Sequence, residues 1–90
     1  MYDPRLSAQY RRDIETLKTR KYDMPKMDEV IVPLLKGETL PPEKRDHALS
    51  GKWKGYRECH ITNTWLLIYK IENKLLLYLA RTGTHSDLFG

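Results

Sequence analysis

Apolar residues recur at helical spacing near the start of the chain. Tyr10, Ile14 and Leu17 follow one another at i, i+4 and i+7, and charged residues fill most of the positions between them. This period places the three side chains on one face of an amphipathic helix. Ser7 precedes the pattern and suits an N-cap, because its hydroxyl can accept a hydrogen bond from a free backbone N–H. We therefore expect a first helix to begin after Ser7.

A second apolar stripe predicts a second helix, from near Asp23 to Lys36. Its members are Met27, Val30, Ile31, Leu34 and Leu35. Pro25 fits the first turn, and Gly37 is suited to end the helix, because glycine readily adopts the left-handed conformation found there. Pro33 removes one backbone hydrogen bond and predicts a kink in the last turn. Two such helices with a short link form a hairpin that needs a flat apolar surface to cover.

The second half of the chain predicts that surface. Residues 38–51 contain Pro41, Pro42 and Gly51, so we expect a loop there. Three strand-length runs follow, separated by short turns that suit antiparallel hairpins: Lys52–Ile61, Trp65–Ile71 and Leu75–Arg81. Tyr2–Leu6 is a candidate edge strand, kept short by Pro4. The expected fold is α+β, with two N-terminal helices packed on a small twisted antiparallel sheet, in one domain over residues 1–90.

Composition narrows the classes of function. Sixteen Lys and Arg against twelve Asp and Glu give a net charge of +4, which favours a polyanionic partner without requiring one. The one cysteine, Cys59, excludes an internal disulfide and a multi-thiolate zinc site, and its place in a strand-like run predicts burial. No apolar signal region or membrane-length apolar run is present. We expect a cytoplasmic protein without membrane contact.

Three histidines make up the whole histidine content, and each lies in or beside a turn signal. We expect His47 in the loop, His60 at the end of a strand, and His85 in a flexible tail. Alternation along the strand places His60 on the same face as Glu58 and opposite Cys59. The pattern alone fits two interpretations: three unrelated surface residues, or a set that the fold brings together.

The segment between the first two histidines alternates basic and aromatic residues, Lys52-Trp53-Lys54-Gly55-Tyr56-Arg57. Such surfaces bind the phosphates and bases of RNA, and imidazoles exchange protons near neutral pH. RNA supplies its own 2′-hydroxyl nucleophile, so cleavage needs only a base, an acid and cations near the phosphate. The histidines with Lys52, Lys54, Arg57 and Arg81 cover those roles. Solvated surface charges are the simpler interpretation of the lysines.

Other chemistries fit this sequence less well. A three-histidine zinc site would usually show His-x-His or His-x-x-x-His spacing, and neither occurs. No Gly-x-Ser-x-Gly motif or glycine-rich phosphate loop is present either. We therefore expect neither a metal nor another cofactor. Core packing is the simpler interpretation of Trp65, and a tail anchor that of Phe89, although each aromatic ring could also stack on a base.

The chain resembles the RelE/ParE superfamily of type II toxins, in particular the YafQ-like branch of messenger-RNA-cleaving toxins. Three segments carry the resemblance: Asp46–His60, Trp65–Lys70 and Arg81–Phe89. The resemblance implies a small twisted antiparallel sheet with two N-terminal helices. It also implies a ribosome-dependent, metal-independent endoribonuclease, an mRNA interferase that cuts the message in the decoding site and halts translation.

By match to these motifs, the catalytic set would be His47, His60, His85 and Arg81. His85 would be the general acid, Arg81 would stabilise the transition state, and Trp65 and Phe89 would shape the RNA pocket. Thr64 occupies the position before the matched tryptophan where YafQ-like toxins carry an acidic residue. The resemblance therefore predicts a site that lacks a carboxylate to orient or charge a histidine.

The resemblance also implies partners. A toxin of this kind is encoded with an antitoxin that covers its active site, and the pair usually represses its own promoter DNA. The ribosome and messenger RNA would be its targets. Two other functions stay open: an inactive relative that binds antitoxin or ribosome without cutting, and a ParE-like gyrase inhibitor, against which the three histidines argue.

Overall fold

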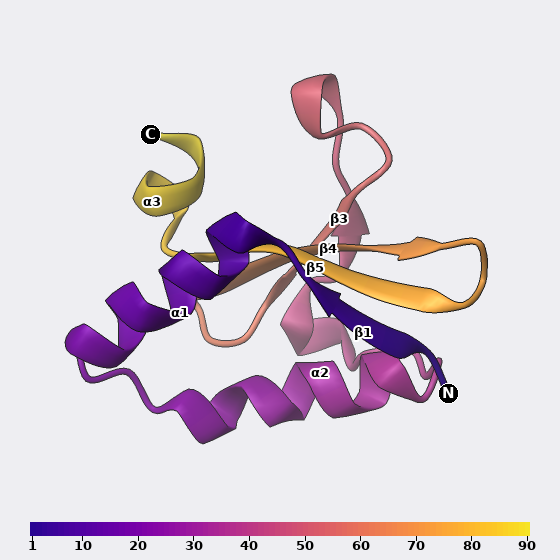
Figure 1. Ribbon diagram of the computed structural model, residues 1–90, viewed down its shortest axis with the longest axis horizontal. Coiled ribbons are helices and arrows are strands. Elements are labelled where there is room, and N and C mark those ends of the chain that lie inside the picture. The colour runs from indigo at the N-terminus through magenta and orange to yellow at the C-terminus, as the bar shows by residue number, and fades with distance from the viewer.

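A five-stranded sheet with the order β1-β5-β4-β3-β2 forms the centre of the computed structural model, which describes residues 1–90 (Figure 1). The strands are β1 (Asp3–Leu6), β2 (His47–Ala48), β3 (Arg57–His60), β4 (Leu66–Glu72) and β5 (Leu76–Gly83). The helices are α1 (Ala8–Thr19), α2 (Asp28–Leu35) and α3 (His85–Phe89), and the 3-10 turns are η1 (Met24–Met27), η2 (Pro42–Lys44) and η3 (Gly51–Trp53). The expected α+β class is confirmed.

The sheet is mixed rather than wholly antiparallel. Strands β2, β3, β4 and β5 pair antiparallel with one another in sequence order, as expected for a meander. The predicted edge strand β1 is present, but it pairs parallel with β5. The all-antiparallel prediction is therefore wrong at this edge. Because β1 continues directly into α1, no tight hairpin fixes its direction.

The helices α1 and α2 lie on one face of the sheet (Figure 1). Ser7 caps α1 as predicted, since its hydroxyl accepts a 2.9 Å hydrogen bond from the Tyr10 N–H. The second helix opens as the turn η1, and α2 then runs two residues past Pro33. Both helices bury their apolar faces against the sheet in one core that includes Tyr10, Leu17, Val30, Leu34, Leu67, Tyr69, Leu77 and Leu79. None of the helices has the length and apolar character that a membrane crossing requires.

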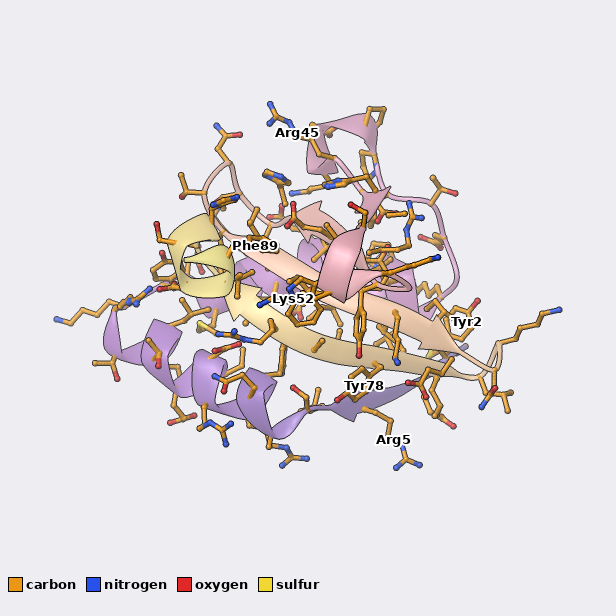
Figure 2. All side chains as sticks on the ribbon, turned by 90° about the horizontal axis from the view of Figure 1, so that it is seen from above. Tyr2, Arg5, Arg45, Lys52, Tyr78 and Phe89 are labelled. Atoms are coloured by element: carbon orange, nitrogen blue, oxygen red, sulfur yellow. The ribbon has the colours of Figure 1, made fainter.

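The opposite face of the sheet is covered only in part, by α3 and by the loop around η3 (Figure 1). A small cluster of Leu66, Ile68, Ala80 and Leu88 lies beneath them, with Leu49, Trp53, Tyr56 and Tyr78 packed around it. Figure 2 looks onto this face, with Phe89 on α3 and Lys52 on the loop. The three candidate catalytic histidines collect on this second face.

The structure corrects three local predictions on this face. The strand expected from Lys52 begins only at Arg57, because positive φ angles at Gly51 (65°) and Gly55 (94°) turn the chain into a loop. The expected loop before it contains β2, so His47 lies in a short strand. His85 lies in α3 and not in a flexible tail, because Thr84 caps a helical turn there.

Candidate active site

A buried carboxylate, Glu58, lies between two of the three histidines. The pairing of β2 with β3 puts His47 directly opposite Glu58, and alternation along β3 puts His60 on the same face. A Glu58 carboxylate oxygen, Oε1, lies 3.6 Å from Nε2 of His47 and 3.8 Å from Nε2 of His60. The side chain of Glu58 is 9% exposed, so water offers little competition for these contacts. The same carboxylate oxygen therefore lies close to two imidazoles.

Each imidazole turns its Nε2 toward the carboxylate, and the surroundings of Nδ1 differ between the two rings. Nδ1 of His47 lies 2.6 Å from the Arg45 carbonyl oxygen. A carbonyl can only accept, so Nδ1 carries the hydrogen and Nε2 is left to exchange protons on the Glu58 side. Nδ1 of His60 is buried without a hydrogen-bond partner. A proton accepted at Nε2 of either ring would face a Glu58 oxygen.

His60 and His85 line one pocket of about 530 Å³ on the second face of the sheet. The remaining lining residues are Glu58, Asn63, Thr64, Leu66, Thr84 and Ser86. The two imidazoles arrive from different elements, β3 and the start of α3, and His47 reaches the same Glu58 carboxylate from β2. The fold thus brings together three histidines that lie far apart in the sequence.

The position of His85 is set by the capping of α3. Thr84 Oγ1 accepts a 3.1 Å hydrogen bond from the Asp87 N–H, and an Asp87 carboxylate oxygen accepts one of 2.9 Å from the Thr84 N–H. This reciprocal arrangement is a capping box, which closes the first turn of a helix. The exposed ring of His85 lies 4.9 Å from that of Phe89, between ring centres, on the next turn. Phe89 is itself 37% exposed, so both rings are available to a ligand.

Arg81 lies outside the pocket lining and is held by a buried carboxylate. Its Nε and Nη2 donate hydrogen bonds of 2.9 Å and 3.0 Å to the two carboxylate oxygens of Asp13 on α1. These bonds raise the pKa of Arg81 above its ordinary value. The structure therefore does not bring the predicted cation into contact with the histidines, and Asp13 offsets part of its charge.

Trp65 does not shape an RNA pocket, and that prediction is wrong. The residue is 2% exposed in the core between the sheet and the helices. Its ring packs edge-on against Tyr22, with ring centres 5.0 Å apart, and its Nε1–H donates a 2.8 Å hydrogen bond to Thr82. A base could not stack on it without opening this core. The simpler interpretation of this tryptophan as core is correct.

The predicted RNA-binding cations fall on two different faces. Lys52 and Lys54 are exposed on the loop around η3, which lies on the same side of the sheet as α3 (Figure 1). Arg57 alternates to the helix-covered face, because its neighbour Glu58 points to the open face. Its Nε donates a 3.2 Å hydrogen bond to Asp46. Of these three cations, only the two lysines lie on the loop that covers part of the second face.

Sequence reasoning missed the role of Glu58. It placed Glu58 on the face of His60 but sought a histidine-orienting carboxylate at position 64, and it expected none because Thr64 stands there. That expectation is corrected: Thr64 lines the pocket, and Glu58 supplies a carboxylate to two histidines. The i, i+2 spacing of Glu58 and His60 was the available signal. The contact of Glu58 with His47 depends on a two-residue strand that the sequence did not reveal.

No group of three or more His, Cys, Asp or Glu side chains has a geometry that could hold a metal ion. Cys59 is fully buried, and burial raises its pKa to about 12, so its thiol is not poised as a nucleophile. The titratable groups that face the pocket are therefore imidazoles and one carboxylate. Imidazoles are the side chains that most often act as general acids and bases in enzymes.

Comparison with known proteins identifies the family. The family model described as "Bacterial toxin of type II toxin-antitoxin system, YafQ" matches residues 2–90. The chain is 43% identical over 89 residues to the "mRNA interferase toxin YafQ" of Escherichia coli strain K12. The aligned region covers 98% of this chain and 96% of that protein. The crystal structure of YafQ from E. coli strain BL21(DE3) superposes with a TM-score of 0.92 over all of both chains, at 37% identity.

A second solved structure is that of the E. coli DinJ-YafQ toxin-antitoxin complex, matched at a TM-score of 0.89 and 41% identity over 99% of this chain and 98% of that one. A family match over almost the whole chain and relatives above 40% identity agree with each other and with the fold. The chain belongs to the YafQ family of bacterial toxins of type II toxin–antitoxin systems.

Proposed function

We propose that this toxin is an endoribonuclease that cuts messenger RNA on the translating ribosome and does so without a metal. The observation that carries the proposal is the convergence of His60 and His85 on one pocket, with Glu58 between His60 and His47. The name of its E. coli relative, an mRNA interferase, supports the same substrate and reaction. The exposed Lys52 and Lys54 supply positive charge on the same face.

In the proposed reaction the RNA 2′-oxygen attacks the adjacent phosphorus while the bond from phosphorus to the 5′-oxygen breaks. His60 takes the proton from the 2′-hydroxyl, and His85 gives a proton to the departing 5′-oxygen. The products are a 2′,3′-cyclic phosphate and a free 5′-hydroxyl, so no water or cofactor is consumed. His60 suits the base because it lines the pocket with His85, and Glu58 lies beside the imidazolium that it becomes.

The remaining groups hold the substrate in this proposal. The adjoining rings of His85 and Phe89 offer a surface on which a base can stack. Arg81 stabilises the extra charge on phosphorus in the transition state through the guanidinium edge that Asp13 does not occupy, at Nη1. His47 lies beside Glu58 and helps to position its carboxylate.

We also propose that the free toxin is controlled by an antitoxin. One solved structure that resembles this chain is that of the E. coli DinJ-YafQ toxin-antitoxin complex. An antitoxin that covers the pocket between His60 and His85 would keep RNA out. The complex of the two proteins would bind promoter DNA, and the toxin alone would act on ribosomes in the cytoplasm.

The proposed function predicts cleavage of a message only while ribosomes translate it. The assay is a purified translation system that keeps its magnesium, with primer extension on the message. Cleavage should persist after the toxin has been dialysed against EDTA and assayed with a zinc-selective chelator, because the histidines do the proton transfers. Loss of cleavage that zinc restores would contradict the metal-free mechanism. Ribosome binding without cleavage would instead identify an inactive binding module.

The two exposed lysines predict a salt-dependent contribution to ribosome binding. Each phosphate contact by a cation contributes about one unit to the slope of log affinity against log salt. The variant Lys52→Ala/Lys54→Ala should therefore bind ribosomes more weakly and flatten this slope by up to about two units. A matched control is Lys36→Ala/Lys74→Ala, which removes the same charge far from the histidines, where both residues border a different pocket. If both double variants behave alike, the loop lysines are ordinary surface charges.

A further inference from the structure

The helix that carries His85 is too short to hold itself in place. α3 has five residues, and isolated helices of this length are not stable in water. Its one buried apolar side chain is Leu88, which packs on the small cluster of the open face. The position of the His85 imidazole over the pocket must therefore depend on further contacts between α3 and the rest of the molecule.

Those contacts meet at the carboxylate of Asp87. The Arg20 guanidinium donates from Nη1 to one carboxylate oxygen at 2.7 Å and from Nη2 to the other at 3.1 Å. The Thr84 N–H donates to the carboxylate as well, at 2.9 Å. These bonds, led by the one from Arg20, hold the pKa of Asp87 well below its usual range. Two parallel bonds from one planar guanidinium fix direction as well as distance.

The backbone next to Arg20 and the backbone next to Asp87 both favour the ion pair between these two residues. Arg20 is the residue that ends α1, and Lys21 then turns the chain away at a φ of 62°. Leu17, one turn earlier, is buried in the main core and anchors this end of the helix. On the other side, a Cβ at Gly83 would lie 2.9 Å from Oδ2 of Asp87, so a side chain there would collide with the carboxylate. Glycine is required for Asp87 to close onto Thr84 and Arg20.

We propose that Arg20 is a positioning residue for His85, acting through Asp87 to fix α3 at the end of α1 so that the imidazole lies over the pocket. The inference rests on the proposed ribonuclease function and deepens it. Arg20 does not line the pocket, and its guanidinium is used by Asp87. Its contribution is the orientation of the proton donor, since misplacing a catalytic group by about 1 Å can cost about 100-fold in rate.

The test compares Arg20→Gln with Lys18→Gln. Lys18 forms another exposed ion pair of α1, with Glu15 at 3.3 Å, that does not reach α3. Arg20→Gln should slow single-turnover cleavage on programmed ribosomes by about tenfold, with ribosome affinity unchanged, because only the alignment of the acid is lost. Arg20→Lys should recover part of the rate, since it restores the charge but not the fork. Lys18→Gln should match the wild type.

Asp87→Asn provides the second half of a double-mutant cycle. The amide oxygen can still cap α3 by accepting from Thr84, but the ion pair with Arg20 is lost. If the pair acts as one unit, Arg20→Gln/Asp87→Asn should cleave no more slowly than the slower single variant. Two fully additive losses would show that the residues act separately and would overturn the inference.

Amide hydrogen exchange in the free toxin separates this inference from the proposed function. Residues of α3 should exchange faster in Arg20→Gln than in Lys18→Gln, while β4 and β5 stay protected. Unchanged protection of α3, or cleavage by Arg20→Gln within about twofold of the wild type, would overturn the positioning role. If the wild type does not cleave at all, the proposed function fails, and faster exchange in α3 would still show that Arg20 holds it.

Discussion

His85→Ala should reduce single-turnover cleavage of ribosome-bound message by about 10²–10⁴-fold, the usual cost of removing a general acid. The substitution deletes the imidazole that lines the pocket together with His60, so the 5′-oxygen must leave without a proton. Binding to ribosome and antitoxin should persist, because His85 is exposed and contributes nothing to the core. Alanine is also well tolerated in the first turn of a helix.

The experiment needs a control at the same place and a profile in pH. Ser86→Ala removes a neighbouring polar group that lines the same pocket but cannot act as an acid at neutral pH, and it should retain most activity. Single-turnover rates should be measured from about pH 5.5 to 8.5. The pH–rate profile of the wild type should show the limb that reports the general acid, and that limb should be missing in His85→Ala. Cleavage by His85→Ala within about threefold of the wild type would rule out the proton-donor role. His85 would then be an RNA-positioning residue beside Phe89.

Substitution of either of the other two histidines should also lower the cleavage rate. His60→Ala removes the proposed base and His47→Ala removes the second imidazole that faces Glu58, so both should impair cleavage. The shared carboxylate couples them. We expect their effects to be non-additive, as is usual for residues that act as a unit.

The sequence was sufficient for the parts of the fold that follow one period. The spacing of Tyr10, Ile14 and Leu17 predicts the buried face of α1, and Ser7 its cap. The apolar runs of β4 and β5 predict central strands covered on one face by the helices, and both strands lie inside the sheet. Each of these features depends on a local pattern of apolar and polar residues, which can be read directly from the sequence.

The rest depends on contacts between distant residues or on very short elements. β2 has two residues and α3 has five, too few to show a period, yet they place His47 and His85. The ion pair of Arg81 with Asp13 joins residues 68 positions apart. The sequence therefore contains no sign that the guanidinium of Arg81 has a carboxylate partner. Trp65 follows the pattern of a strand that faces the core, and the family motif alone suggested a place in the pocket.

Asp13→Ala should lower the free energy of unfolding by about 3 kcal/mol, because it breaks a buried ion pair from one side. The Asp13 carboxylate accepts hydrogen bonds from Arg81, from Gln9 and from the backbone N–H of Thr82. Asp13 and Thr82 are both buried, so water cannot fully replace the lost partner. Removing it leaves the Thr82 N–H unpaired and the Arg81 charge without its counter-ion.

Urea denaturation and thermal melting of the purified toxin measure this effect. For a domain of this size, about 3 kcal/mol corresponds to a fall in melting temperature of about 12–24 °C. Glu15→Ala is the matched control, since Glu15 is an exposed acid on the same helix and should change stability by less than about 0.5 kcal/mol. Asp13→Asn should fall between the two, because the amide oxygen can still accept from Thr82 while the ion pair is gone. If Asp13→Ala is as stable as Glu15→Ala, the ion pair adds no net stability, and α1 is held to β5 by its apolar face alone.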